Sequence, residues 1–396
     1  RHEDRLCAAQ LLSPCPQVNL WYQERETCTD FDEGRKCIHC LPGRPDACAI
    51  RQADAVAYRL KRLGVNPGTR AFDLLFGRLV TLAEGATEAA AKVLPRARAV
   101  RAFEANVTRP SAPGKGLPRP VESEALRFRS RRETIVTLMN AHCDRILCVS
   151  GRVAEVARRH GLSPRLLEVA YIGTKQAGKF AETRPKARLL RPDGTLSLGY
   201  LGYMRRDKGF FFLLDALEAL PALAARRLHL VIAARAGPPE AMARIEALSE
   251  RFASVHHADG YTHSTLDALL SQVDVGVVPV LWEDNLPQVA IEMHARHIPL
   301  ITSDLGGAKE LGATPRMVFR AGDASGLHDV LFDLLAERVD LSAYWRRARA
   351  PASMDEHAAE LTALYRTLRD GTRPATETVR APRKANGAAE PVTAAR

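Results

Sequence analysis

Two short polar segments of the chain each follow an apolar run with the length of a buried strand. The segment 282–285 (WEDN) follows residues 275–279, and Pro287 can then begin a helix without losing a backbone hydrogen bond. The segment 302–307 (TSDLGG) follows residues 298–301. The carboxyl ends of parallel strands lie at one edge of a sheet, where open α/β folds bind ligands. Carboxylates, amides and glycine backbone groups at that edge could hold an anion and the hydroxyl groups of a ligand.

A basic turn could add positive charge to the same edge. Residues 196–201 predict a strand and 210–220 a helix, and the turn between them contains Arg205, Arg206 and Lys208. Fixed cations and helix N-termini can neutralise a bound phosphate group without a metal. The turn is therefore either a clamp for phosphate groups or a solvated basic loop.

A block of cysteines lies near the amino terminus. Its four members are Cys28, Cys37, Cys40 and Cys48, and Cys7 and Cys15 precede them. Four thiolates could close a tetrahedral zinc site, but the spacing is that of no standard zinc finger, so a disulfide and reduced cysteines are alternatives. The segment 30–32 (DFD) has the Asp-x-Asp form that can hold a divalent cation, yet it does not follow a buried strand. We interpret that segment as coincidental and predict a structural zinc at the four cysteines.

Length and composition indicate a globular protein of two domains. The chain has 396 residues, 46% hydrophobic and 26% charged. A net charge of +11 favours an anionic partner, whether a phosphorylated substrate, nucleic acid or a membrane surface, although arginine-rich helix faces exposed to solvent would explain it equally. No segment is apolar enough for a spanning helix or a signal core, so we predict a cytoplasmic protein, with the inner face of the membrane as an alternative site.

Predicted strands and helices alternate along the chain, which indicates an α/β fold with parallel sheets. The pattern predicts a helical region with an apolar stripe over 54–98, a loop over 108–120, and a strand-helix-strand unit over 145–171 after a basic helix at 122–142. We place domains at 1–185 and 186–370, followed by a disordered tail at 371–396. The polar, unpatterned start without an initiating Met suggests a fragment or a processed product.

Three sequence segments resemble a known family. WEDNLPQVAIE, followed by HIPLITSDLGGAKEL, resembles the carboxyl-terminal half of retaining, nucleotide-sugar-dependent glycosyltransferases of family 4, which have the GT-B fold of two Rossmann-like domains. LGYMRRDKGFFFLLDALEAL resembles the diphosphate-binding turn of that family, and MNAHCDRILCVS with YIGT resembles the end of its amino-terminal domain. The resemblance is specific over 196–311, fair over 128–180 and faint before that. It implies an α/β chain of the GT-B type whose amino-terminal, acceptor-side domain is incomplete here.

The resemblance also implies roles for individual residues. An acidic residue, seven intervening residues and a glutamate correspond to Asp284 and Glu292, with Asp284 in place of the usual glutamate beside the sugar and Glu292 at the ribose hydroxyls. Lys208 would bind the diphosphate, helped by Arg205 or Arg206, because the arginine of the family is Tyr203 here. The backbone amides expected to meet sugar hydroxyls and phosphates are those of Asn285, Leu286, Gly306 and Gly307.

The implied activity is transfer of a hexosyl group from a nucleotide sugar to a glycan or lipid-linked acceptor, with retention of configuration and without a catalytic cofactor or a nucleic-acid partner. Such chemistry belongs to polysaccharide or glycolipid biosynthesis and allows peripheral membrane association. Transfer by this chain should be poor if its acceptor domain is incomplete. The alternatives are a phosphorylase of the same fold, a catalytically silent GT-B domain that binds a nucleotide or glycan, and a basic nucleic-acid binder, for which we find only charge.

Overall fold

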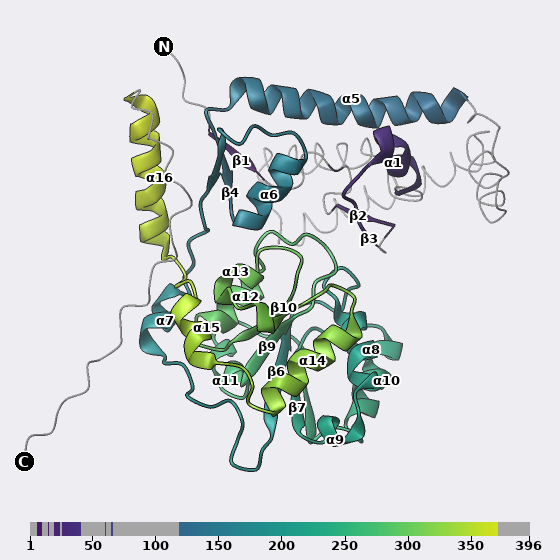
Figure 1. Cartoon of the computed structure of the whole chain (residues 1–396), viewed down its shortest axis with the longest axis vertical. Coiled ribbons are helices and arrows are strands. Elements are labelled where there is room, and N and C mark those ends of the chain that lie inside the picture. Colours follow the sequence, from purple (N-terminus) through teal and green to yellow (C-terminus); the bar gives the residue numbers. More distant parts are fainter. Residues whose placement is uncertain are drawn as a thin grey trace, which may run out of the picture. The chain divides into compact units, whose positions relative to one another are not determined.

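The computed structural model describes residues 6–9, 15, 20–23, 26–40, 60, 65 and 119–370. Apart from the start of helix α5, the elements discussed below belong to one compact unit made of Arg1–Cys40 and Leu126–Arg396. This unit contains two parallel sheets, which we call the front sheet and the rear sheet in chain order (Figure 1).

The rear sheet has six parallel strands in the order β11-β10-β9-β6-β7-β8. Their bounds are β6 Leu196–Leu201, β7 Leu228–Ala233, β8 Ser254–Ala258, β9 Val275–Val278, β10 Leu300–Ser303 and β11 Val318–Phe319. Numbered from β6 as the first, this is the Rossmann order, and the winding reverses between β6 and β9. Ligands of such sheets bind outside the carboxyl ends of the strands at this reversal point.

Helices cover both faces of the rear sheet because its strands are apolar on both sides. One buried cluster packs α8 (Phe210–Ala219), α10 (Pro239–Leu248) and α14 (Ala324–Leu335) on the sheet, and a second packs α11 (Leu266–Leu270) and α12 (Gln288–His294). The shorter or peripheral helices are α9 Ala222–Ala225, α13 Lys309–Gly312, α15 Leu341–Arg347 and α16 Met354–Arg369. All six residues of β6 are buried, as expected for the centre of a covered parallel sheet.

The front sheet has three parallel strands in the order β1-β4-β5, with bounds β1 Leu6–Ala9, β4 Arg145–Cys148 and β5 Leu167–Val169. Its helices are α5 Arg119–His142 and α6 Gly151–Arg159. A hairpin of β2 (Trp21–Tyr22) and β3 (Glu26–Thr27), a 3₁₀ turn (Asp32–Gly34) and α1 (Arg35–Cys40) complete this region. Together with the rear sheet, these elements confirm the predicted α/β fold of the GT-B type.

Several predicted boundaries need correction. The start of the chain, interpreted as unpatterned, contains β1, which pairs with β4. The stretch 172–194 contains a helix that the sequence did not predict, α7 (Ala177–Glu182), whose Phe180 stacks on His297 with ring centroids 4.1 Å apart. Helix α12 ends at His294, and His297, three residues further on, has φ 54° in the left-handed region.

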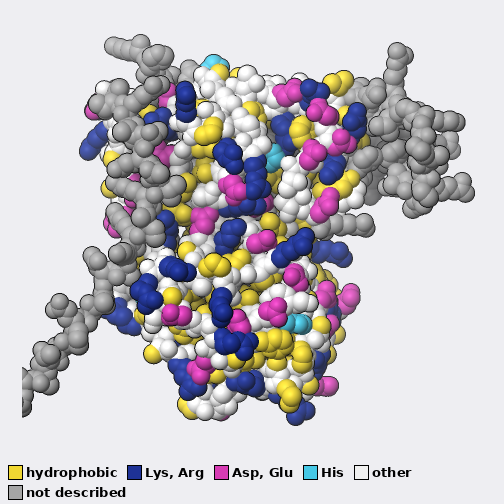
Figure 2. Space-filling model, viewed as in Figure 1, with side chains coloured by type: hydrophobic (Ala, Val, Ile, Leu, Met, Phe, Trp, Pro, Cys, Tyr) yellow, Lys and Arg dark blue, Asp and Glu magenta, His cyan; other side chains and the backbone are white. Residues whose placement is uncertain are grey.

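Other predictions fall outside the described residues, namely the helical region 54–98 except for residues 60 and 65, the loop before 119, and the tail 371–396. Among the helices that the structure describes, none combines the length and the apolar content needed to cross a membrane. On the face of the molecule shown in Figure 2, Lys and Arg side chains are interspersed with Asp and Glu.

Candidate functional site

The turn after β6 and the loop after β9 meet at the reversal point of the rear sheet. Lys208 Nζ lies 2.6 Å from Asp284 Oδ2 and 4.9 Å from the centre of the Trp282 ring. Gly209 makes this approach possible: its φ is +72°, and a Cβ there would lie 1.7 Å from the carbonyl oxygen of Pro279. The structure thus joins the predicted phosphate clamp directly to the predicted sugar contact.

The glycine turn after β10 closes on the same loop. Gly307 N donates to the carbonyl of Asp284 at 3.0 Å, and Gly306 N donates to Glu283 Oε2 at 3.0 Å. A Cβ at Gly306 would lie 2.3 Å from the Asp284 carbonyl oxygen, and Gly306 has a φ of +68°, so no other residue fits there without a shift of the backbone. Both glycine amides are therefore occupied within the protein, and their predicted contact with a ligand stays a prediction.

Two other predicted amides are not occupied in this way. The backbone N–H groups of Asn285 and Leu286 make no hydrogen bond with any other residue that the structure describes. The Oδ1 atom of Asn285 and the Nε1 atom of Trp282 are also buried without a hydrogen-bond partner. Unpaired buried polar atoms are costly, so these groups are suited to receive the hydroxyl groups of a ligand.

Glu292 projects from α12, the helix that follows this loop. Its side chain is buried, and its Oε2 accepts a hydrogen bond from the Tyr261 hydroxyl at 3.0 Å. Burial raises the pKa of Glu292, while the hydrogen bond from Tyr261 and the charge of Arg296 oppose that rise. Tyr261 comes from the loop after β8, so the carboxyl ends of β8 and β9 both contribute to the surroundings of Glu292.

The two arginines of the basic turn differ in their partners. Arg205 donates two hydrogen bonds of 2.9 Å to the buried carboxylate of Asp207. The side chain of Arg206 is exposed and makes no hydrogen bond or ion pair with another described residue. Tyr203 is 63% exposed at the position where the resembled family has arginine. Of the two candidates to replace that arginine, Arg206 is the one not already held by a carboxylate.

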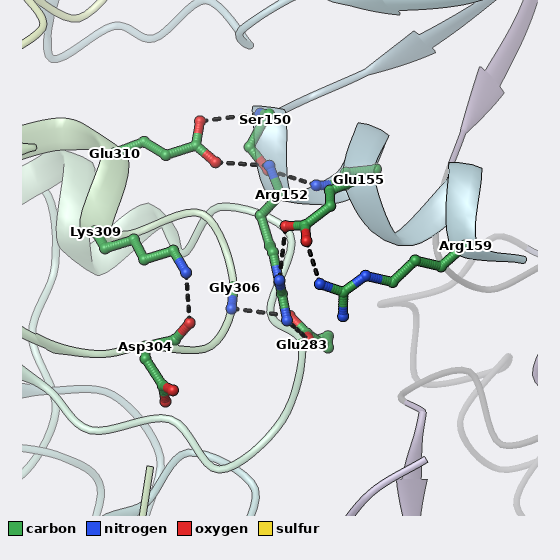
Figure 3. Close-up of polar contacts among 11 residues, drawn as sticks. Ser150, Arg152, Glu155, Arg159, Glu283, Asp304, Gly306, Lys309 and Glu310 are labelled. Carbon is green, nitrogen blue, oxygen red and sulfur yellow. Dashed lines mark hydrogen bonds and ion pairs between the residues drawn. The ribbon is translucent and has the colours of Figure 1, made fainter. Parts of the chain in front are cut away.

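A group of residues that the sequence did not predict as functional connects the two sheets (Figure 3). Arg152 at the start of α6 binds Glu283, with Nε 2.8 Å from Oε2 and a second, shorter bond to Oε1. Glu310 of α13 accepts hydrogen bonds from the backbone amides of Gly151 at 2.9 Å and Arg152 at 2.7 Å. Ser150, the only one of these residues with a local sequence signal, caps α6 and donates to the carbonyl of Asn285 at 2.9 Å.

The zinc prediction is not tested by the structure. None of Cys15, Cys28, Cys37 and Cys40 is in a disulfide, and Cys48 lies outside the described residues. Burial, and next the proximity of Cys15, raise the pKa of Cys37 to about 11 and raise that of Cys28. Within the described ranges, no three His, Cys, Asp or Glu side chains are placed to hold one metal ion. A structural zinc therefore stays a prediction.

The rear domain is similar in sequence to a family of known proteins. Residues 195–337 match the sequence model of a family described as Glycosyl transferases group 1. That segment contains β6 to β11 and, with them, Lys208, Asp284, Glu292 and the two glycines of the turn after β10. This part of the chain is thus similar in sequence to group 1 glycosyltransferases. A search of curated proteins gave no match.

Three solved structures are similar to part of this chain. HepE of Anabaena in complex with UDP is 15% identical, with a TM-score of 0.47 over 60% of this chain and 68% of that one. Trehalose 6-phosphate synthase of Burkholderia multivorans is 18% identical, with a TM-score of 0.45 over 65% and 66% of the two chains. Sucrose-phosphate synthase of Thermosynechococcus elongatus is 22% identical, with a TM-score of 0.44 over 61% and 63%.

Proposed function

We propose that this protein transfers a hexosyl group from a nucleotide sugar to a glycan or lipid-linked acceptor with retention of configuration. The observation that carries the proposal is the Lys208–Asp284 pair, which lies at the reversal point of a Rossmann-ordered sheet inside the segment that matches group 1 glycosyltransferases. A sugar diphosphate presents hydroxyl groups next to negative charge, and this pair offers an acceptor next to a cation.

Each side chain then has a defined role. Lys208 neutralises the diphosphate, with Arg206 as the second cation of the turn, and Glu292 accepts hydrogen bonds from the ribose hydroxyls. Asp284, with the amides of Asn285 and Leu286, meets the hydroxyl groups of the transferred sugar. These roles need no metal, because fixed cations and the N-terminus of α8 can balance the charge of the leaving diphosphate.

In the reaction, the bond between the anomeric carbon and the phosphate oxygen breaks, and a bond from the acceptor oxygen forms on the same face of the sugar. The transition state is oxocarbenium-like, and the proton of the acceptor hydroxyl passes to the leaving phosphate oxygen. Lys208 contributes most where negative charge develops on that oxygen, since preorganised charge acts strongly in a site shielded from water.

A screen of nucleotide sugars by saturation-transfer NMR tests the proposal. UDP-, GDP- and ADP-sugars are offered in parallel, and the proposal requires that at least one binds and that its sugar is transferred or released. Lys208→Ala should weaken the corresponding nucleoside diphosphate at least about tenfold and leave the bare nucleoside unchanged. A matched control is Lys186→Ala, because Lys186 also pairs with a buried aspartate, Asp274, at 2.5 Å, but at the amino end of β9.

The alternative is a catalytically silent domain that still binds a nucleotide or glycan. It is favoured by Tyr203, which replaces a cation of the resembled family with an exposed aromatic ring. Binding of a nucleotide sugar without any transfer or hydrolysis, over a wide range of acceptors, would support this alternative. Nucleoside diphosphate binding that is unchanged in both Lys208→Ala and Arg206→Ala would contradict both functions.

A further inference from the structure

The start of helix α6 contacts the two loops of the candidate donor site. Ser150 Oγ donates to the carbonyl of Asn285, and Arg152 binds both carboxylate oxygens of Glu283. Glu310, just beyond the glycine turn, accepts the first two amides of α6 and a hydrogen bond from the Tyr171 hydroxyl at 2.5 Å. Figure 3 shows the Arg152 side chain pointing toward Glu283 and the Glu310 side chain pointing toward the start of α6.

Glu283 is the centre of this group. It is 2% exposed, and one of its oxygens, Oε2, accepts both from Arg152 Nε at 2.8 Å and from the backbone amide of Gly306 at 3.0 Å. A buried carboxylate is retained only with charge and hydrogen-bond partners, so its position is determined jointly by the arginine of the front helix and by the glycine turn. Glu283 is also the residue immediately before Asp284, which holds Lys208.

A nearby ion pair on α6 does not itself contact the donor loops. Arg159 binds Glu155 one turn back, and the two side chains are 48% and 39% exposed. Arg152 also bonds to Glu155, at 2.7 Å, but its guanidinium is mostly buried and its contact with Glu283 supplies the largest upward shift of its pKa. The two arginines are thus seven residues apart on one helix, and only one reaches the donor loops.

We propose that Arg152 is a positioning residue of the donor site. Its bond to Glu283 fixes the loop 283–286, and the bond from Glu283 to the Gly306 amide fixes the turn 304–307. Arg152 thus determines the position of the ligand-binding groups on these two loops without contacting the ligand. The link to donor binding rests on the proposed function, whereas the effect on the two loops does not.

Trp282 gives a direct readout of the loop, because it precedes Glu283 and lies against Lys208. The chain has three tryptophans, so protein labelled with 5-fluorotryptophan should give three fluorine signals, and Trp282→Phe assigns the one of interest. The first test variant is Arg152→Met, and its control is Arg159→Met, which makes the same chemical change on the same helix.

A second variant guards against misfolding caused by an unpaired buried charge. Arg152→Met combined with Glu283→Gln leaves no uncompensated carboxylate and keeps an acceptor for the Gly306 amide, but removes the connection to α6. We expect the Trp282 signal to shift or broaden in both variants and to stay in place in Arg159→Met. A Trp282 signal unchanged in the folded double variant would overturn the proposal.

Donor binding gives the second readout. The double variant should bind the best nucleotide sugar of the screen about tenfold more weakly, which corresponds to about 1.4 kcal/mol. Its affinity for the bare nucleoside should be unchanged, because Glu292 lies on α12 rather than on the two loops. Equal losses for nucleoside and nucleotide sugar would indicate general destabilisation and contradict the positioning role. If the parent protein bound no nucleotide sugar, the proposed function would fail, and the Trp282 signal alone would judge the role of Arg152.

Discussion

Replacement of Glu292 by Gln provides the most direct test of the donor site. Glu292 is only 7% exposed, so a ligand does not have to remove much water from it. Tyr261 uses one acceptor position on Oε2, and the other oxygen remains available to a ribose diol, which offers two donors. Hydrogen bonds to a charged group contribute about 1.5–3 kcal/mol in net terms, and Gln keeps the shape but loses the charge and one acceptor. The variant should therefore bind a nucleoside diphosphate about 10- to 100-fold more weakly.

Titration calorimetry with UDP, GDP and ADP in parallel would measure this loss. Tyr261→Phe is the control, because it removes the hydrogen bond to Glu292 but leaves the carboxylate in place. The pH dependence gives an independent test: burial raises the pKa of Glu292, so its charge is lost at a higher pH than that of an exposed glutamate. Parent affinity should then fall as the pH decreases, and the affinity of Glu292→Gln should vary less. Parent-like binding by a Glu292→Gln protein with an unchanged circular dichroism spectrum would refute the ribose role.

Three further predictions concern stability and metal content. Gly209→Ala should cost at least about 3 kcal/mol in thermal denaturation, since its Cβ would strike the Pro279 carbonyl, whereas Gly322→Ala, with a φ of +78° and no atom within 4 Å, should cost only about 1–2 kcal/mol. Burial lowers the pKa of His294 to about 4, so neutral His294 stabilises the fold, and this contribution is lost as the pH falls from about 6.5 toward 4. The free energy of unfolding, measured in urea, should therefore depend less on pH in His294→Phe. An unaltered pH dependence would contradict this. Metal analysis should find about one zinc per chain, bound by Cys28, Cys37, Cys40 and either Cys48 or Cys15. Replacing each of these cysteines by Ser in turn would show which of the last two is the fourth ligand. Less than about a tenth of an equivalent of zinc in the parent protein would rule out the site.

Local patterns were sufficient to predict most of the rear sheet. The strand at 196–201 and the helix that starts at Phe210 have the predicted bounds within one residue, because an apolar run buried on both faces and a glycine before a helix are strong signals. The meeting of Lys208 with Asp284 also follows from the rule that parallel strands place their carboxyl ends together. Both features depend on periodicity and topology, which a single sequence contains.

The contact of Arg152 with Glu283 could not be predicted in the same way. The two residues are 131 positions apart, and neither has a pattern that distinguishes it from an exposed charged residue on a helix or loop. The use of the Gly306 and Gly307 amides inside the protein was missed for a similar reason, since it depends on how closely two loops approach. Strand β1 was missed because it is four residues long and its pairing with β4 comes from a partner distant in sequence.

Because Lys208 and Asp284 form an ion pair, Asp284 competes with any anion that binds Lys208. An anion alone would have to draw Lys208 away from a carboxylate 2.6 Å distant and leave Asp284, which is largely buried, without its cation. A sugar alone would have to draw Asp284 away from Lys208 and leave the lysine without its carboxylate. Only a ligand that carries both a diphosphate and a hydroxylated sugar can satisfy the two partners at once, so the pair acts as a test for two chemical groups in one molecule. Under the proposed function, Asp284 would compete again for Lys208 after the sugar has left, and the remaining diphosphate would be bound less tightly than the donor.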